Sequence, residues 1–175
     1  MASPFFIQSK SGDLVIGLQD RSTKPGTLLD AFTRKAEGPD RNYQLWEFVH
    51  STFKGYSLLR NPASGLVIDI QGASSKSGTP LKAFTISNVG TPPLDTNSDH
   101  QVWEFVPSSE AGFYFIQSGL GDLVVDLNGA AGGTGAPLSA HWKKSNGPHH
   151  QLWTLVDEKG EIVTPPAPFV AASNK

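Results

Sequence analysis

A Gln-x-Trp motif that occurs three times constrains the fold of this chain more than any other feature of its sequence. The motif recurs at a period of roughly 50 residues, and each copy follows similar short apolar segments in the same order. These segments are rich in β-branched and aromatic residues and are bounded by Gly, Ser, Asn or Pro, which is typical of strands. The three copies are Gln44-Leu45-Trp46, Gln101-Val102-Trp103 and Gln151-Leu152-Trp153.

Three further segments precede each motif, so each unit is expected to form four short strands. A four-stranded unit cannot bury its apolar face alone, and three such units must close around a shared core. The sequence therefore predicts an all-β protein with a β-trefoil fold, a six-stranded barrel capped by three hairpins with pseudo-threefold symmetry and three core tryptophans. The segments are Phe5–Ser9, Gly12–Leu18 and Leu28–Phe32; Tyr56–Arg60, Ser64–Ile70 and Pro80–Phe84; and Phe113–Ser118, Gly121–Leu127 and Pro137–His141.

The repeat predicts a single trefoil domain over residues 1–157, with lobes at about 5–50, 51–107 and 108–157. Residues 158–175 form a C-terminal extension, in which Lys159-Gly160-Glu161 is expected to turn a small hairpin. The segment from Ile86 to Asp99 is rich in Gly, Pro and Ser and is expected to be a surface loop.

Composition excludes several function classes. The chain carries 14 Lys+Arg and 16 Asp+Glu, a net charge of -2, so nucleic acid is not the expected partner. It has no cysteine, hence no disulfide, thiolate metal site or cysteine nucleophile. No apolar run approaches the ~18 residues of a membrane span, so membrane insertion is not expected. The N-terminus lacks the basic and apolar regions of a secretory signal, and we expect a cytoplasmic protein.

The repeated residues resemble the ricin B-type lectin family, whose three-lobed trefoil repeats a Gln-x-Trp motif. The resemblance covers roughly residues 5 to 156, and the pairs His100-Gln101 and His150-Gln151 are similar to those of mushroom agglutinins in that family. It implies a lectin without enzymatic activity or cofactor that binds galactose- or N-acetylgalactosamine-type glycans. In such lectins a lobe holds its sugar by an Asp on the second strand and by a backbone amide three residues later. An aromatic ring further along and a polar residue before the Gln complete the contacts.

Carried over residue by residue, the resemblance implies binding sites in the second and third lobes. In the second lobe the implied ligand-binding residues are Asp69, Gly72, Phe84, His100 and Gln101. In the third lobe they are Asp126, Gly129, His141, Trp142, Lys144, His150 and Gln151, with either His141 or Trp142 covering the sugar. In the first lobe Gly17 stands at the Asp position, so no such site is expected there, although Phe32 keeps the ring.

The chemistry of a neutral sugar suits these residue types. A carboxylate accepts two hydroxyl donors at once, and such charge-assisted hydrogen bonds are strong. An aromatic ring covers the apolar C–H face of the sugar. Asp126 is expected to be a surface carboxylate at the end of a strand. A shallow site of this kind binds with roughly millimolar to micromolar affinity, so several sites are needed for avidity. A homodimer is one way to supply further sites.

Each candidate also has a structural interpretation. Asp is a common turn residue, Phe84 can cap its lobe, and each motif Gln can brace the backbone or hold the Asp. Adjacent histidines such as His149 and His150 point apart on a strand, and no third ligand is suitably spaced, so no metal site is expected.

Catalysis is not expected, because the chain lacks a nucleophile-elbow serine and a phosphate-cradling glycine loop. The alternative function is that of a β-trefoil protease inhibitor or other protein-binding module. Such an inhibitor presents one protruding loop, for which the segment from Ile86 to Asp99, with Pro92-Pro93, is the candidate.

Overall fold

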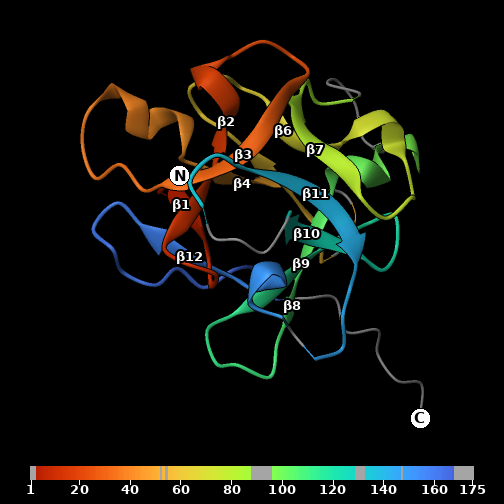
Figure 1. The fold of residues 1–175 in the computed structure, drawn as a ribbon. Helices are drawn as coiled ribbons and strands as arrows, with labels where there is room; N and C mark the ends of the chain where they lie inside the picture. The colour runs from red at the N-terminus through yellow and green to blue at the C-terminus, as the bar shows by residue number, and fades with distance from the viewer. Residues whose placement is uncertain are drawn as a thin grey trace.

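The protein folds as an all-β trefoil, as the repeat predicts. A computed structural model describes residues 3–51, 53, 55–87, 96–128, 133–146 and 148–167, without the side chains of 96–98. Twelve strands form one antiparallel sheet (Figure 1). The first lobe contains β1 (Phe5–Ser9), β2 (Leu14–Leu18), β3 (Thr27–Thr33) and β4 (Glu47–His50). The second contains β5 (Ser57–Arg60), β6 (Val67–Ile70), β7 (Thr79–Phe84) and β8 (Trp103–Pro107). The third contains β9 (Tyr114–Ser118), β10 (Leu123–Leu127), β11 (Ala136–Trp142) and β12 (Trp153–Asp157).

Strands β1, β4, β5, β8, β9 and β12 form the closed barrel. The first and last strands are neighbours, paired from Phe5 opposite Asp157 to Ser9 opposite Trp153. The β4 side is closed by Phe5 and Trp46, whose backbone groups exchange two hydrogen bonds of 2.8 Å. Closure leaves these strands without a free sheet edge.

The remaining strands form three hairpins, β2–β3, β6–β7 and β10–β11, which meet over one end of the barrel. Each hairpin is joined to the next lobe by the same contact, in which a glycine N–H donates to an alanine carbonyl. The glycines have φ of +93°, +88° and +83°, a region that side-chain-bearing residues rarely adopt. The three bonds run from Gly26 to Ala83, from Gly78 to Ala140 and from Gly135 to Ala31, each at 2.8 Å.

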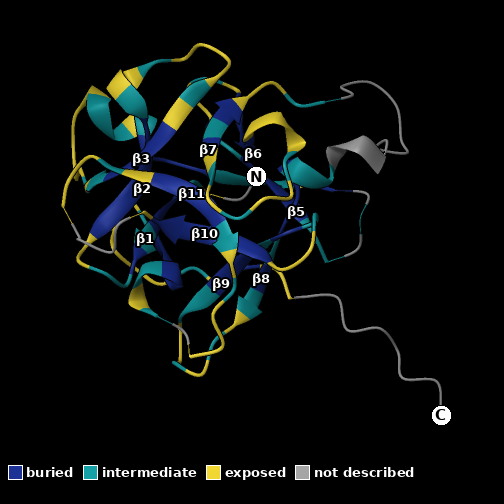
Figure 2. Cartoon of the chain, turned by 45° about the vertical axis from the view of Figure 1, so that its right-hand side comes forward, coloured by how far each residue is buried: buried dark blue, intermediate teal, exposed yellow. Residues whose placement is uncertain are grey.

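The core lies inside the barrel and beneath the hairpins, where the three motif tryptophans are fully buried. Figure 2 shows that the buried residues concentrate on the strands, whereas the connecting loops are exposed. Phe5 packs on Phe48, and Phe48 contacts the edge of Phe105, so aromatic rings continue across the barrel. The burial of each indole ring contributes a few kcal/mol by area.

The beginning of the C-terminal extension folds back onto β12. Asp157 and Glu161 are bridged by a backbone hydrogen bond of 2.8 Å, which confirms the turn expected at Lys159-Gly160-Glu161. Val163 then donates its N–H to the carbonyl of Leu155 at 2.9 Å and packs against the core.

The segment expected to be a loop, 86–99, is described only in part. Thr96–Gln101 forms a short 3-10 helix, η4, so the end of this segment is helical instead of irregular. Residues 88–95, which include Pro92-Pro93 of the inhibitor alternative, lie outside the described residues.

The glycine contacts between hairpins generate a stability prediction. Gly26→Ala is expected to lower the free energy of unfolding by about 1–2 kcal/mol, because alanine resists the left-handed backbone at φ +93°. No described residue would lie within 4 Å of a Cβ atom at this position, so steric contact adds nothing. Gly133→Ala is the matched control, because its Cβ would likewise meet none of the described residues within 4 Å and its φ lies outside the left-handed region. Urea denaturation of both variants tests this, and equal stabilities would contradict it.

Candidate functional site

The core tryptophans fix the strand that carries the candidate carboxylate in each lobe. Each indole Nε1 donates to the carbonyl of the residue just before the site position, at 3.0 to 3.1 Å. This bond ties β2, β6 and β10 to the barrel below them. The acceptors are Ile16 for Trp46, Ile68 for Trp103 and Val125 for Trp153.

The motif glutamines hold the backbone around each site with a repeated set of hydrogen bonds. The Oε1 atom accepts a backbone N–H, and Nε2 donates to a backbone carbonyl just after the third strand of the lobe or at its end. The Oε1 donors are Lys35, Ser87 and Lys144, at 2.8 to 3.0 Å. The Nε2 acceptors are Thr33, Thr85 and Trp142, at 3.0 to 3.1 Å.

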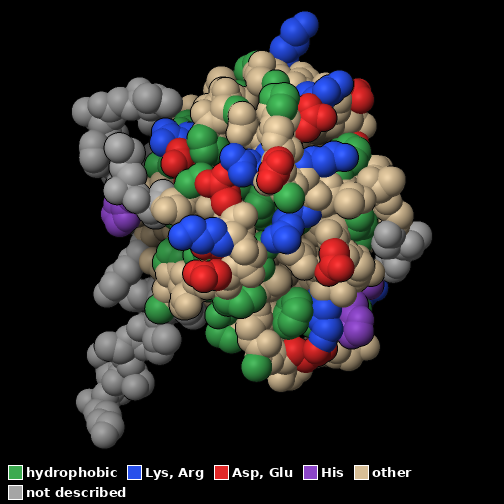
Figure 3. Space-filling model, turned by 90° about the vertical axis from the view of Figure 1, so that its left-hand side faces the viewer, with side chains coloured by type: hydrophobic (Ala, Val, Ile, Leu, Met, Phe, Trp, Pro, Cys, Tyr) green, Lys and Arg blue, Asp and Glu red, His purple; other side chains and the backbone are tan. Residues whose placement is uncertain are grey.

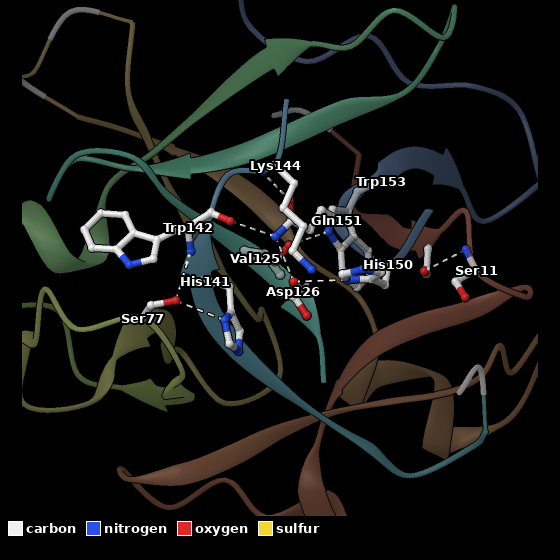
Figure 4. A network of polar contacts seen from close by, with 11 residues as sticks. Ser11, Ser77, Val125, Asp126, His141, Trp142, Lys144, His150, Gln151 and Trp153 are labelled. Carbon is white, nitrogen blue, oxygen red and sulfur yellow. Dashed lines mark hydrogen bonds and ion pairs between the residues drawn. The ribbon is translucent and has the colours of Figure 1, made fainter. Parts of the chain in front are cut away.

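In the third lobe the structure brings Asp126, His150 and Gln151 together (Figure 4). Gln151 donates its second Nε2 hydrogen to Oδ2 of Asp126 at 2.8 Å. Nδ1 of His150 lies 3.1 Å from the same oxygen and hydrogen-bonds to it. Both contacts use Oδ2, and no described residue donates a side-chain or backbone hydrogen bond to Oδ1. Oδ1 is therefore the oxygen that can accept hydrogen bonds from a ligand.

Asp126 is not the surface carboxylate that the sequence suggests. Its residue is only 5% exposed, since it lies under the glutamine and histidine side chains that contact it. It lies one residue before the end of β10, close to the strand end that the sequence predicts, and opposite Ser139 of β11. A buried carboxylate needs hydrogen-bond partners, and the motif glutamine supplies one.

The second lobe repeats this arrangement around Asp69, which is 2% exposed. Gln101 donates to its Oδ2 at 2.7 Å, and Nδ1 of His100 lies 3.1 Å from that oxygen without the alignment of a hydrogen bond. Lys82 lies directly opposite Asp69 on β7, and its Nζ sits 4.4 Å from the centre of the Phe84 ring. The ammonium of Lys82 therefore lies over the Phe84 ring, and the described residues form no ion pair between Lys82 and Asp69.

Strand alternation separates the two aromatic candidates of the third lobe. His141 pairs with Val124 and shares the face of β11 that carries Ser139, the partner of Asp126. The side chain of Trp142 projects from the opposite face of β11 and is 56% exposed. Figure 4 shows its indole pointing away from Asp126. Phe84 occupies the position of His141 in the second lobe, where it pairs with Val67.

A residue of the second lobe positions His141, which the repeat within one lobe could not reveal. Ser77 Oγ lies 3.0 Å from Nδ1 of His141 and accepts the backbone N–H of Trp142 at 3.1 Å. Ser77 precedes Gly78, whose N–H donates to Ala140, so the contact between hairpins places it there. The hydroxyl fixes the orientation of the imidazole ring.

The remaining predicted residues make few contacts with the side chains of the candidate sites. Lys144 is exposed and is joined to Gln151 through its backbone N–H. Gly72 is exposed on a short turn with φ +66°, and Gly129 lies outside the described residues. His149 is exposed, and the described residues contain no group of three His, Asp or Glu placed to hold a metal ion.

The first lobe keeps the backbone contacts of the other two but carries no carboxylate at Gly17. A carboxylate occurs instead on the facing strand, because Asp30 of β3 lies directly opposite Gly17. Asp30 is buried and accepts a hydrogen bond from Nε2 of Gln19 at 2.9 Å. Burial raises the pKa of Asp30, and the hydrogen bond from Gln19 offsets part of this rise.

The family follows from comparison of the sequence with known protein families. A family model described as ricin-type beta-trefoil lectin domain-like matches residues 42–141, more than half of the chain. The chain belongs to this family. No curated protein sequence matches it significantly. None of the helices in the described residues is long and apolar enough to cross a membrane.

Solved structures share the fold of this lectin-family domain at low sequence identity. The designed threefold-symmetric protein ThreeFoil superimposes with a TM-score of 0.74 at 21% identity, covering 88% of this chain and 98% of its own. The Macrolepiota procera ricin B-like lectin, solved with lactose, gives 0.67 at 21% identity and covers 89% and 96%. The C-half of the earthworm R-type lectin, solved with GalNAc, gives 0.59 at 21% identity and covers 86% and 96%. At this identity the likeness establishes the fold.

The raised pKa of Asp30 predicts how the stability of this lectin-family domain depends on pH. A carboxyl group with a raised pKa binds its proton more readily in the folded chain than in the unfolded chain. Its ionised form therefore lowers stability at neutral pH, and this loss is relieved as the pH falls through the pKa of the folded state. Asp30→Asn keeps an acceptor for Gln19 and is expected to raise Tm at pH 7, with a gain that shrinks in acid.

Thermal unfolding over a series of pH values measures this difference. Asp13→Asn is the matched control, because Asp13 is exposed and accepts a hydrogen bond from Nε2 of Gln8 at 3.1 Å. The control variant is expected to change Tm at pH 7 less than Asp30→Asn does. A lower Tm for Asp30→Asn at pH 7 would show that the charge of Asp30 stabilises the fold.

Proposed function

We propose that this protein is a lectin without enzymatic activity that binds galactose- or N-acetylgalactosamine-type glycans in its second and third lobes. Membership of the ricin-type lectin family supports carbohydrate binding. The structures of relatives with lactose and with GalNAc support this class of sugar. Asp69 and Asp126 are the proposed centres of the two sites.

The observation that carries the proposal is that the same three side chains meet in both lobes. In each, the motif glutamine donates to Oδ2 of the aspartate at 2.7 or 2.8 Å, and a histidine Nδ1 lies 3.1 Å from the same oxygen. A carboxylate held on one oxygen presents its other oxygen in a fixed orientation. Pre-oriented acceptors bind hydroxyl donors with a smaller entropic cost than mobile ones do.

The glutamines are positioning residues in this proposal. Gln101 and Gln151 are fully buried, and both hydrogens of each Nε2 are donated to protein acceptors. They have no donor left for a sugar. Their role is to hold Asp69 and Asp126 relative to the backbone.

A ring on the aspartate face completes each proposed site. His141 in the third lobe and Phe84 in the second share the face of their hairpin with the carboxylate. The C–H face of a galactose-type sugar packs on such a ring, while its hydroxyls reach the carboxylate. Lys82 adds a cation to the second site, so the two sites differ in charge.

Loss of either carboxylate is expected to remove one site. Asp69→Asn and Asp126→Asn preserve the size of the side chain and an acceptor for the glutamine, whereas alanine would leave a buried donor unpaired at a cost of about 1–3 kcal/mol. Each single variant is expected to halve the stoichiometry of lactose binding in titration calorimetry. The double variant is expected to lose lactose binding while its Tm stays near that of the wild type.

Agglutination of red cells distinguishes avidity from intrinsic affinity. Either single variant is expected to bind free lactose normally at its remaining site but to lose cross-linking. A single variant that agglutinates at wild-type titre would show that oligomers or the first lobe supply valency, which sedimentation separates. Lactose binding by the double variant at wild-type stoichiometry would refute the aspartate-centred sites.

A further inference from the structure

The first lobe contains a hollow at the position of the other two sites. Its volume is about 230 Å³, and its walls include Gly17, Asp20, Phe32, Tyr43 and Gln44. This is smaller than a typical pocket for a drug-sized ligand and suits one small sugar. A Cβ on Gly17 would lie 3.3 Å from Cγ of Gln44 and 3.4 Å from the carbonyl oxygen of Tyr43, so these two residues pack against β2 at the floor of the hollow.

Gln44 has an unused hydrogen-bond donor in this hollow. Its residue is 5% exposed, its Oε1 accepts from Lys35 and one Nε2 hydrogen goes to Thr33. In the other lobes the second Nε2 hydrogen goes to the aspartate carboxylate, but no described residue accepts it in the first lobe. A ligand oxygen at the place of the missing carboxylate would accept this hydrogen.

The first lobe also has its carboxylate at a different position. The second lobe reads Asp69-Ile70-Gln71-Gly72, whereas the first reads Gly17-Leu18-Gln19-Asp20, so aspartate and glycine have exchanged places. Asp20 has φ +52°, close to the +66° of Gly72, although side-chain-bearing residues resist this conformation. Aspartate adopts this conformation more readily than most residues, and Asp20 lines the hollow.

We propose that the first lobe is a third sugar site, selective for an N-acetylated hexose. The acetamido carbonyl accepts the free Nε2 hydrogen of Gln44, its N–H or a ring hydroxyl donates to Asp20, and its methyl group packs on Phe32. A ring Cδ2 atom of Phe32 lies 3.5 Å from the position of a Cβ on Gly17, so the apolar wall and the free amide adjoin.

The charges around the hollow favour this neutral group over a carboxylate. Arg21 is already paired with Asp40 at 2.9 Å, and Lys35 faces the same hollow as Asp20. The buried Asp30 adds a negative charge nearby, which disfavours an anionic ligand. Figure 3, which views the molecule from the left of Figure 1, shows acidic and basic side chains interspersed on that face, with no basic patch.

This inference rests on the proposed function only in taking a sugar as the ligand, because it uses neither Asp69 nor Asp126.

The side-chain amide signal of Gln44 in a nitrogen-15 NMR spectrum reports the site directly. The probes are two matched pairs, N-acetylgalactosamine with galactose and N-acetylglucosamine with glucose. The Asp69→Asn/Asp126→Asn variant is used beside the wild type.

In the wild type and in the Asp69→Asn/Asp126→Asn variant, at least one acetamido sugar is expected to shift the Gln44 signal. It is expected to do so at a concentration about tenfold lower than the matching sugar without the acetamido group. Asp20→Gly is expected to weaken this binding at least tenfold, as the loss of one charge-assisted bond does, without lowering Tm, because glycine relieves the left-handed strain. Ala73→Gly, at a left-handed position of the second lobe with φ +51°, is the matched control and should leave binding at Gln44 unchanged.

Gly17→Asp is expected to abolish the Gln44 response, because its carboxylate occupies the free amide hydrogen. The inference is overturned if Gln44 does not respond to either acetamido sugar, if both members of each pair act equally, or if Asp20→Gly binds as the wild type. The two proposals can fail separately. If lactose binding needs Asp69 and Asp126 but no acetamido sugar shifts the Gln44 signal, this inference is refuted and the proposed function stands. If an acetamido sugar shifts the Gln44 signal but lactose binding does not need those aspartates, the proposed function is refuted and this inference stands.

Discussion

The hydrogen bond from each core indole to the second strand of its lobe connects the stability of the fold to the geometry of the sites. The tryptophan is buried for its apolar area, but its Nε1 must find an acceptor, and it finds the carbonyl just before residue 17, 69 or 126. The strand is thereby held at the point from which the site side chain projects. The glutamine two residues before the tryptophan then holds the third strand and, in two lobes, the carboxylate itself.

This shared framework allows the three lobes to differ at the positions that line the candidate sites. The backbone contacts of the glutamines and tryptophans repeat within a few tenths of an ångström. By contrast, the residue facing the site position from the third strand is Asp30, Lys82 or Ser139 in turn. Each lobe thus combines the same geometry with a different local charge, and the framework does not change when one of these residues does.

The sequence predicts the parts of this molecule that repeat along the chain. The strand order and the core tryptophans follow from motif spacing, since each recurs in phase with the repeat. The grouping of Asp126, His150 and Gln151 is implied by the resemblance to the lectin family. Contacts between lobes carry no such signal, and so the position of Ser77 beside His141 could not be anticipated.

The burial of Asp126 was missed for another reason. Spacing indicates where a residue lies along a strand but not what covers it, and here the residues that cover it come from the end of the lobe. The pairing of Lys82 with Asp69 and of Asp30 with Gly17 depends on hairpin register. That register is the same in all three lobes, because eight residues connect the paired strands of each hairpin (19–26, 71–78 and 128–135). The position that faces the aspartate therefore repeats with the motif, whereas the residue that occupies it differs.

The pairing of β1 with β12 has a consequence for how the chain folds during synthesis. Phe5 emerges from the ribosome well before its partner strand, which ends at Asp157. Until β12 emerges, the backbone of β1 lacks a hydrogen-bonding partner along one edge, and the barrel cannot close. Pairings between such distant residues are slow to form because a long chain segment must first be ordered. A nascent chain that pauses before residue 153 therefore exposes an unpaired strand edge, which is the state most prone to associate with other chains.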